Sequence, residues 1–479
     1  MPPSPRRPRW VLAGLMLGLF VAALDQTVFA TALPALTREL GQVDALLWVP
    51  TAYVVTATVT MPVYGLLGDL VGRGRMLVAA LTLFLLGSVI GGLAPDLGWL
   101  VAGRAVQGLG GGGLLVLVQA MAVELVPPRD RPRQLSIVGA VFALAAVTGP
   151  LLGGWLADTI GWRWAFWLNL PVGAVALAAA GVLLRRPAPQ PVRIDVAGIA
   201  AMAVAVSGLV LLAAWGGTTY AWTSPVVVGL AAVAVLAGAV LLVVERRAPA
   251  PLIPPALVTT RGFCVPTLAG LVMAVALFGT VSYLPTHLQL AYGLSARGAG
   301  LLMLALVGGL GLATLGSAEV VRRTARPLEA AAAGGLTAAA GLALTALLPG
   351  SSSLALVGTS LFVLGLGIGG TWQVLLLAAQ AAAPPAQLGT ATGLHTFVRE
   401  IGVVLGTAVV GAAYAARLPP LVAARLPADA YRDALAPVLL ALAPTLVLAA
   451  VGLMLAGVRG GSPAPRPAAA VERAGLGTR

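Results

Sequence analysis

Fourteen long apolar runs follow one another along the chain, and each is close to the roughly 20 residues that an α-helix needs to cross a bilayer. They lie at residues 10–33, 46–67, 76–94, 97–122, 134–156, 164–184, 196–215, 225–244, 262–286, 298–320, 328–348, 354–380, 389–416 and 435–458. The runs read as helices because a backbone in lipid must satisfy its own hydrogen bonds, and the alternating pattern of barrel strands is absent. The sequence therefore predicts an all-α integral membrane protein with 14 transmembrane helices.

The composition excludes the soluble classes of protein. Of the 479 residues, 59% are hydrophobic and only 9% are charged, whereas a soluble domain carries about 25% charged residues. There are too few charges to coat even one soluble domain, so a cytoplasmic enzyme, a nucleic-acid-binding domain and a disordered protein are ruled out. The single cysteine, Cys264, excludes a disulfide framework and a Cys-rich metal site. No nucleotide loop or nucleophile triad is apparent, and we expect neither catalysis nor a cofactor or metal.

The positions of the basic residues predict the orientation. Of the 29 basic residues, twenty-one fall in segments that are inside if the N-terminus is inside, six fall outside, and two lie within spans. This bias follows the positive-inside rule. We therefore expect both termini on the cytoplasmic side of a bacterial inner membrane, and we attribute the net charge of +13 to topology and not to nucleic-acid binding.

Two proline-rich loops, 185–195 and 245–261, divide the spans into groups of six, two and six. They predict an N-terminal six-helix bundle over residues 10–184, a two-helix insertion over 195–244 and a C-terminal six-helix bundle over 262–458.

A few charged side chains lie inside the spans, where insertion of each costs about 2.5–3.5 kcal/mol, so each is a functional candidate. At 1.5 Å per helical residue, Asp25 lies about 12 Å and Arg104 about 10 Å from the outer side. We prefer a titrating pair on a transport path, with a purely structural ion pair as the alternative. Arg399 and Glu400 form a second centre. Adjacent helical residues point about 100° apart, so we expect them not to pair; Arg399 serves as a structural charge at the cavity, and Glu400 as a second proton or cation site.

Four segments combine glycine with polar residues: 24–36, 65–77, 100–113 and 139–154. In the second, Asp69 and Arg73 fix a tight inside turn, and glycine allows close packing and positive φ. In the third, Arg104 and Gln107 share a helix face. In the fourth, a pair of glycines four residues apart allows close helix approach, and a proline can kink the helix. The residues to which we assign conformational roles are Gly65, Gly68, Asp69, Gly72, Arg73, Gln107, Gly108, Gly139, Gly149, Pro150, Gly153 and Gly154.

Together and in this order, these segments make the chain resemble the major facilitator superfamily, and within it the fourteen-span drug:proton antiporters. Residues 65–77 are similar to the loop motif between spans 2 and 3, 100–112 to the span-4 Arg-x-x-Gln-Gly motif, 139–154 to the span-5 antiporter motif, and 24–34 to the span-1 Leu-Asp-x-Thr motif. The chain departs from the pattern at Ala30, where the group usually has Asn, and at 316–328, where the loop motif of the second half is at best degenerate.

The resemblance implies two six-helix bundles that rock around a central cavity, with spans 7 and 8 outside them. The cavity would be lined by Phe29, Gln107, Phe278, Tyr283, Trp372 and Gln373; for the aromatic residues, ordinary packing is the alternative. It implies a monomer that exports lipophilic, cationic drug-like compounds in exchange for protons, with export of an endogenous antibiotic, siderophore or lipid as the alternative. A membrane enzyme or sensor would need a soluble domain, for which the loops are too short.

The resemblance and the charge pattern also predict a latch at the inner side. No charged residue lies between Ala381 and Phe397, where span 13 begins. A helix N-terminus carries about half a positive charge, so Asp69 is expected to dock near Gly389 in the outward-open state.

Overall fold

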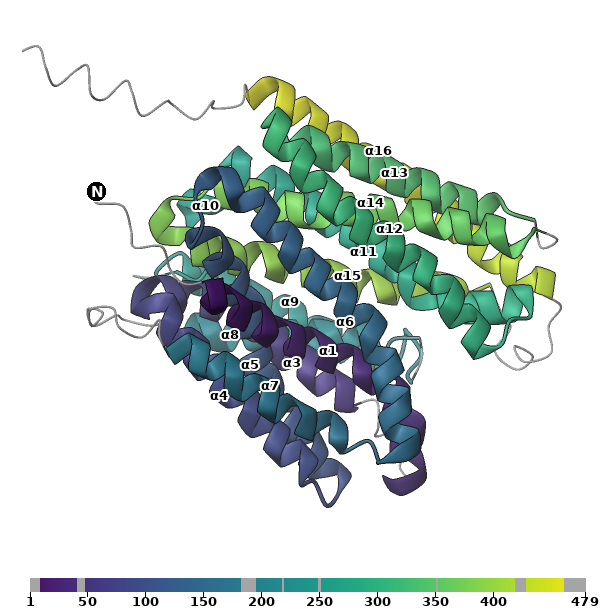
Figure 1. Ribbon diagram of the computed structural model, residues 1–479, viewed down its shortest axis with the longest axis horizontal. Helices are drawn as coiled ribbons and strands as arrows, with labels where there is room; N and C mark the ends of the chain where they lie inside the picture. Colours follow the sequence, from purple (N-terminus) through teal and green to yellow (C-terminus); the bar gives the residue numbers. More distant parts are fainter. Residues whose placement is uncertain are drawn as a thin grey trace, which may run out of the picture.

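The computed structural model describes residues 9–40, 48–181, 195–217, 219–248, 251–349, 352–417 and 428–460, and Figure 1 shows that long helices dominate it. The first six are α1 (Arg9–Leu40), α3 (Trp48–Leu67), α4 (Arg73–Gly92), α5 (Leu97–Glu124), α6 (Arg131–Thr159) and α7 (Trp164–Gly181). The next two are α8 (Val196–Trp215) and α9 (Pro225–Glu245). The last six are α11 (Arg261–Tyr292), α12 (Ala296–Thr324), α13 (Pro327–Leu347), α14 (Leu354–Ala381), α15 (Leu388–Ala415) and α16 (Ala428–Gly460). A short helix, α10 (Pro255–Val258), lies in the second proline-rich loop.

The predicted all-α fold with fourteen long helices is confirmed. Thirteen apolar segments in the described ranges are long enough to cross a membrane, because α3 and α4 count as one segment, Trp48–Gly92. A single π-helical turn, Gly68–Gly72, separates these two helices. The largest boundary differences are at α1, which continues to Leu40, and α16, which begins at Ala428. Each extension contains an arginine and at least one acidic residue, so hydropathy alone does not detect them.

The helices form two bundles, as Figure 1 shows: α1 and α3–α7 on one side, and α11–α16 on the other. Each bundle has its own apolar core, the first around Leu114, Phe84 and Leu19, the second around Leu361, Leu342 and Leu446. The hairpin of α8 and α9 lies beside α3 and α15. At its outer end Trp215 packs edge-on against Trp48 of α3, with ring centroids 5.1 Å apart.

Glycines let α5 pass through the middle of the first bundle. A β-carbon at Gly108 would lie 2.5 Å from the carbonyl oxygen of Tyr53 on α3, and one at Gly110 would lie 2.3 Å from the carbonyl oxygen of Ala80 on α4. Only glycine permits such an approach between helix backbones. This packing fixes the depth and direction of the polar side chains that α5 carries.

The contacts we describe between the two bundles lie in the predicted inner halves of the helices. Helix α3 packs against α15, where a β-carbon at Gly65 would lie 2.6 Å from the carbonyl oxygen of Gly389. Helix α6 packs against α12 and α14, and a β-carbon at Gly139 would lie 2.4 Å from Thr314. The bundles are therefore joined at their predicted inner side.

Candidate transport site

The deepest polar cluster of the first bundle, the N-terminal charged centre, consists of Asp25, Ser88, Arg104, Gln107 and Asn169. The Arg104 Nη1 donates to Asp25 Oδ2 and, at 2.7 Å, to Gln107 Oε1. The Asp25 Oδ1 accepts from Gln107 Nε2 at 2.7 Å and from Asn169 Nδ2 at 2.9 Å. Ser88 Oγ accepts from both amides, at 3.0 and 3.2 Å. Helices α1, α4, α5 and α7 thus meet in one hydrogen-bonded network.

The surroundings of this centre are apolar and closed. The side chains of Arg104 and Asp25 are only 2% and 0% exposed. The Arg104 guanidinium lies between two aromatic rings, 4.6 Å from the centroid of Phe29 and 4.4 Å from that of Tyr53, an arrangement that stabilises a cation. Its Nε donates to the carbonyl oxygen of Val49 at 3.4 Å.

The structure brings Asp25 and Arg104 together, as their matched depth predicts, and places two of the expected cavity residues elsewhere. Gln107 is hydrogen-bonded within the network, and Phe29 packs against Phe166 with ring centroids 4.6 Å apart. Both lie inside the first bundle and not at a pocket between the bundles, because the glycine face of α5 draws the helices together around them. Sequence reasoning missed Ser88 and Asn169. The available signal was a lone polar side chain in an apolar span near the depth of Asp25.

The C-terminal charged centre, Arg399 and Glu400 on α15, is built differently. The expectation that these neighbours cannot pair is wrong: the Arg399 Nη2 donates to Glu400 Oε1 at 3.0 Å. Their Cα–Cβ bonds diverge, but the long arginine side chain curls far enough to bridge that angle. The Arg399 residue is 5% exposed, whereas the Glu400 side chain is 23% exposed.

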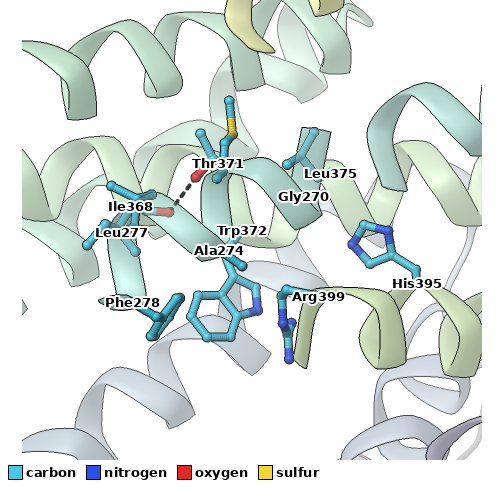
Figure 2. Close-up of a pocket in the computed structure, with 11 residues that line it drawn as sticks. Gly270, Ala274, Leu277, Phe278, Ile368, Thr371, Trp372, Leu375, His395 and Arg399 are labelled. Atoms are coloured by element: carbon cyan, nitrogen blue, oxygen red, sulfur yellow. Dashed lines mark hydrogen bonds between the residues drawn. The ribbon is translucent and has the colours of Figure 1, made fainter. Parts of the chain in front are cut away.

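Arg399 borders a small pocket between α11, α14 and α15, which Figure 2 shows. Its guanidinium lies 4.2 Å from the ring centroid of Trp372. Phe278 packs edge-on against the same indole, with centroids 4.7 Å apart. His395 lines the pocket, and its Nδ1 lies 3.2 Å from Thr267 Oγ1. The cavity holds about 20 Å³, which is room for one water molecule.

Of the predicted cavity residues, Phe278, Trp372 and Arg399 therefore lie together, while two others do not join them. The Tyr283 hydroxyl lies 3.4 Å from the carbonyl oxygen of Thr407, and its ring packs against Tyr414 on the outer side of the pocket. Gln373 is buried and turned toward α6, where its Cγ would lie 3.0 Å from a β-carbon at Gly139. Gln373 points away from the pocket that Trp372 lines, because side chains at adjacent helical positions point in different directions.

Asp69 forms a contact between the bundles, which we call the inner latch: Asp69 with Gly389 and Thr390 at the N-terminus of α15. The Asp69 Oδ1 accepts from the Gly389 N–H at 2.9 Å, and Oδ2 accepts from the Thr390 N–H at 2.7 Å and its hydroxyl at 2.8 Å. Arg73 Nη2 donates to Asp69 Oδ1 at 2.6 Å, and Arg73 Nη1 donates to Glu124 at 2.6 Å. A carboxylate at a helix N-terminus is stabilised by the free backbone N–H groups and the helix dipole.

Glycines of the same turn make this geometry possible. Gly72 has φ +108°, in the region that favours glycine, and its turn directs the chain from α3 into α4. A β-carbon at Gly68 would lie 2.8 Å from Leu117 of α5. With Gly65 pressed against α15, this segment touches both bundles.

The glycines of α6 divide between two partners. A β-carbon at Gly149 would lie 1.8 Å from Thr27 Oγ1 of α1, so the predicted close helix approach occurs here. Gly153 is buried on the same face, one turn beyond the in-helix Pro150. A β-carbon at Gly154 would meet nothing within 4 Å. Gly139, in contrast, contacts the other bundle.

Two helical bundles, each with a buried charged centre, are thus joined at one end by the inner latch. The sequence pattern of the Major Facilitator Superfamily matches residues 15–198 and 193–407. The chain belongs to this superfamily of membrane transporters.

Curated relatives support the same assignment. An uncharacterized MFS-type transporter of Mycobacterium tuberculosis (strain ATCC 25618 / H37Rv) is 40% identical over 86% of this chain and 60% of its own length. The multidrug transporter protein MdtP of Bacillus subtilis (strain 168) is 32% identical over 85% of this chain and 75% of its own length. The chain thus spans about three fifths of the mycobacterial relative.

Among solved structures, the crystal structure of the human organic anion transporter MFSD10 superposes with a TM-score of 0.67 over 93% of this chain and 99% of that one. The sequences are 16% identical, so this likeness shows the fold alone.

Proposed function

We propose that this chain exports small lipophilic molecules across a bacterial cytoplasmic membrane in exchange for protons. Membership of a transporter superfamily and similarity to a protein named as a multidrug transporter support export. The observation that carries proton coupling is Asp25, a carboxylate whose side chain is fully buried and held by three donors from other helices.

The balance of forces on Asp25 suits a group that changes its protonation state. Burial favours the neutral carboxyl, whereas Arg104 and the two amides favour the carboxylate. At an effective dielectric near 20, an ion pair at 4 Å is worth about 4 kcal/mol, similar to the cost of inserting a charge into the bilayer. A small displacement of the donors therefore decides whether Asp25 binds a proton.

The packing supplies a route by which bundle movement would displace those donors. Thr27 lies two residues beyond Asp25, and its hydroxyl donates to the carbonyl oxygen of Ala145 on α6 at 3.1 Å. Helix α6 also carries Gly139, which packs against the other bundle. Rocking of the bundles would thus pull on α1 through α6, while Arg104 stays with the tightly packed α5.

In the proposed cycle, Asp25 takes a proton from the outside and releases it to the inside when Arg104 returns. The membrane potential adds about 2.3 kcal/mol per charge for each 100 mV. The inner latch would hold the inside closed during the first step, because it joins α3 and α15 there.

The transported molecules are proposed to be lipophilic because the pocket walls at Phe278, Trp372 and Leu277 are apolar or aromatic. The family resemblance suggested a cation, but a buried guanidinium in the wall opposes one, since like charges repel strongly in a region of low dielectric. Endogenous products remain the alternative cargo.

Proton release from purified protein tests the proposal. Addition of a transported dye, first identified by uptake into inverted vesicles, should release protons from the wild-type protein at neutral pH. The Asp25→Asn variant should still fold and bind the dye but release none.

Asp158→Asn, an exposed acidic position on α6, is the matched control and should release as many protons as the wild type. Unchanged release from the Asp25→Asn protein would disprove the proposed coupling and direct attention to Glu400.

A further inference from the structure

We propose that the Arg399 pocket binds a carboxylate group, so that the transported molecules include lipophilic organic acids. This inference rests on the proposed export function and names the chemical class of its substrate. The inference rests on two neighbouring groups that line one pocket, the buried guanidinium of Arg399 and the indole N–H of Trp372, both of which have donors without an acceptor.

The first observation is a set of buried donors without acceptors. Among the described residues, the Nε and Nη1 of Arg399 and the Nε1 of Trp372 are buried and make no hydrogen bond. Figure 2 shows the indole nitrogen on the side of the ring that faces Arg399. An unsatisfied buried donor costs about 1–3 kcal/mol, and more when it is charged. Because all three groups donate, the partner that would satisfy them is an acceptor.

The second observation is the charge of the site. Arg399 is only 5% exposed, and it donates to Glu400 through Nη2 alone. A guanidinium carries five N–H donors in a planar fork that matches a carboxylate. Glu400 is partly exposed and bonds only Nη2 of Arg399, so the Nε and Nη1 donors remain for an anion. A bound anion is favoured there, and a cation is not.

The walls describe the rest of the ligand. Phe278, Leu277 and Ile368 border the pocket and offer apolar surface, which favours an aromatic or aliphatic body attached to the acid. His395 and Thr371 also line the pocket, but His395 contacts Thr267 and the Thr371 hydroxyl donates to backbone carbonyl groups. The unpaired donors of the pocket are therefore those of Arg399 and Trp372.

The pocket is too small for such a ligand in this arrangement, and one residue explains how it would enlarge. Trp372 also packs toward Phe142 of the first bundle, with ring centroids 6.2 Å apart. The indole therefore forms the wall between the pocket and the inter-bundle contact. Separation of α6 from α14 would free the indole to rotate and admit a ligand larger than the present cavity.

A binding experiment with two matched probes tests the inference. The full-length protein is placed in phosphatidylcholine nanodiscs, which contain no anionic lipid, and titrated with dansylglycine and with dansylglycinamide. The probes differ only by carboxylate against neutral amide. The wild type should bind the acid at least tenfold more tightly, because a hydrogen bond to a charged group contributes about 1.5–3 kcal/mol.

Three variants make the result specific to the site. Arg399→Gln should abolish the preference for the acid while binding of the amide stays within twofold. Trp372→Phe keeps the ring and removes the donor, so the preference should fall several-fold. Arg417→Gln, an exposed arginine just beyond the end of the same helix, should behave as wild type. If Arg399→Gln does not fold, Trp372→Phe alone decides.

Equal binding of both probes by the wild type, or a preference that persists in Arg399→Gln and in Trp372→Phe, would overturn the inference. The experiment does not depend on proton coupling. Equal binding of both probes by the wild type, together with intact Asp25-dependent proton release, refutes only the substrate class. An acid preference without Asp25-dependent proton release refutes only the proposed antiport.

Discussion

The two buried charged centres are alike in composition and different in construction. Each pairs an arginine with an acid and stacks the guanidinium on aromatic rings, Phe29 and Tyr53 in one case and Trp372 in the other. In the N-terminal centre the partners come from α1 and α5, and amides complete the network. In the C-terminal centre the partners are neighbours on α15, and two nitrogens of the arginine remain unused.

The difference shows how similar residues acquire different roles. A network that spans four helices is sensitive to any movement among them, so it suits a group that responds to bundle motion. A pair on one helix moves as a unit, so its unused donors stay available in a fixed direction. We therefore assign the coupling role to the first centre and ligand binding to the second.

The largest expected effect comes from removal of Arg104, and removal of Arg399 is the comparison. Arg104→Gln leaves the carboxylate of Asp25 buried without its charged partner, and loss of one member of a buried pair costs about 3–5 kcal/mol. Arg399→Gln should cost about 1 kcal/mol or less, because Glu400 is partly exposed and such pairs contribute little. Unfolding of both variants in mixed micelles with increasing SDS measures the difference. Equal destabilisation would remove the basis of our comparison.

Opening the inner latch should expose the inner side of the contact between the two bundles. Asp69→Asn loses the charge that faces the α15 N-terminus, and we expect transport to fall about tenfold, as loss of a charge-assisted hydrogen bond implies. Leu376 lies in the core that the bundles share on this side. A cysteine placed there by Leu376→Cys, in a Cys264→Ser background, reports access to this core. Its alkylation by a maleimide should accelerate in the Asp69→Asn protein.

The half-buried acidic residue Asp130, near the start of α6, provides the control. Asp130→Asn should change neither transport nor labelling. Normal transport by a correctly inserted Asp69→Asn protein would show that the latch has no role in the cycle.

A pair of glycine substitutions should loosen the first centre without touching its charges. In Gly149→Ala the new β-carbon would collide with Thr27, which lies two residues beyond Asp25 on α1, and overpacking of this kind costs about 1–3 kcal/mol. Gly154→Ala, on the same helix, meets open space and should be nearly neutral. Thermal melting of the two proteins checks this, and identical melting temperatures would mean that the α1–α6 contact relaxes freely.

The smallest effect is expected at an exposed charge contact, which sets the scale for the buried ones. Two hydrogen bonds, the larger contribution from Arg163 and the smaller from Trp162, hold the pKa of Glu39 below its usual value of 4.5. The stabilisation is therefore present above about pH 4.5 and is lost as the pH falls through the lower pKa of the folded protein. Because the Glu39 side chain is 47% exposed, it is worth about 0.2–1 kcal/mol.

The melting temperature of wild type should exceed that of Glu39→Gln by a degree or so at pH 7, by the usual relation between stability and melting temperature. The gap should close toward pH 3. A gap that widens on acidification would contradict the assigned direction of the pKa.

Much of this organisation could be predicted from the sequence, and the reasons for the misses are physical. Span positions follow from hydropathy, and the approach of Asp25 to Arg104 follows from helix rise, because depth in a bilayer is a one-dimensional quantity. The docking of Asp69 at Gly389 was expected from the family resemblance together with the charge of a helix N-terminus.

The depth of a residue in the bilayer does not predict how its helix is rotated about its axis, and so does not predict which neighbours its side chain faces. That is why Phe29 and Gln107 were expected at a cavity but lie inside the first bundle, and why Gln373 faces α6 while Trp372 faces the pocket. Side-chain conformation is a further unknown, as the bond between Arg399 and Glu400 shows. Ser88 and Asn169 were missed because a single polar residue in an apolar span has no sequence partner to identify it.

The main-chain half of the inner latch has a genetic consequence. Two of the three donors to Asp69 outside its own segment are backbone N–H groups, which no codon change other than one to proline can remove. A charge swap between partners is therefore impossible here, and loss of Asp69 has no complementary change at Gly389. Second-site revertants of an Asp69 mutant should instead be scattered over other helices, at positions whose alteration weakens the inward-open state.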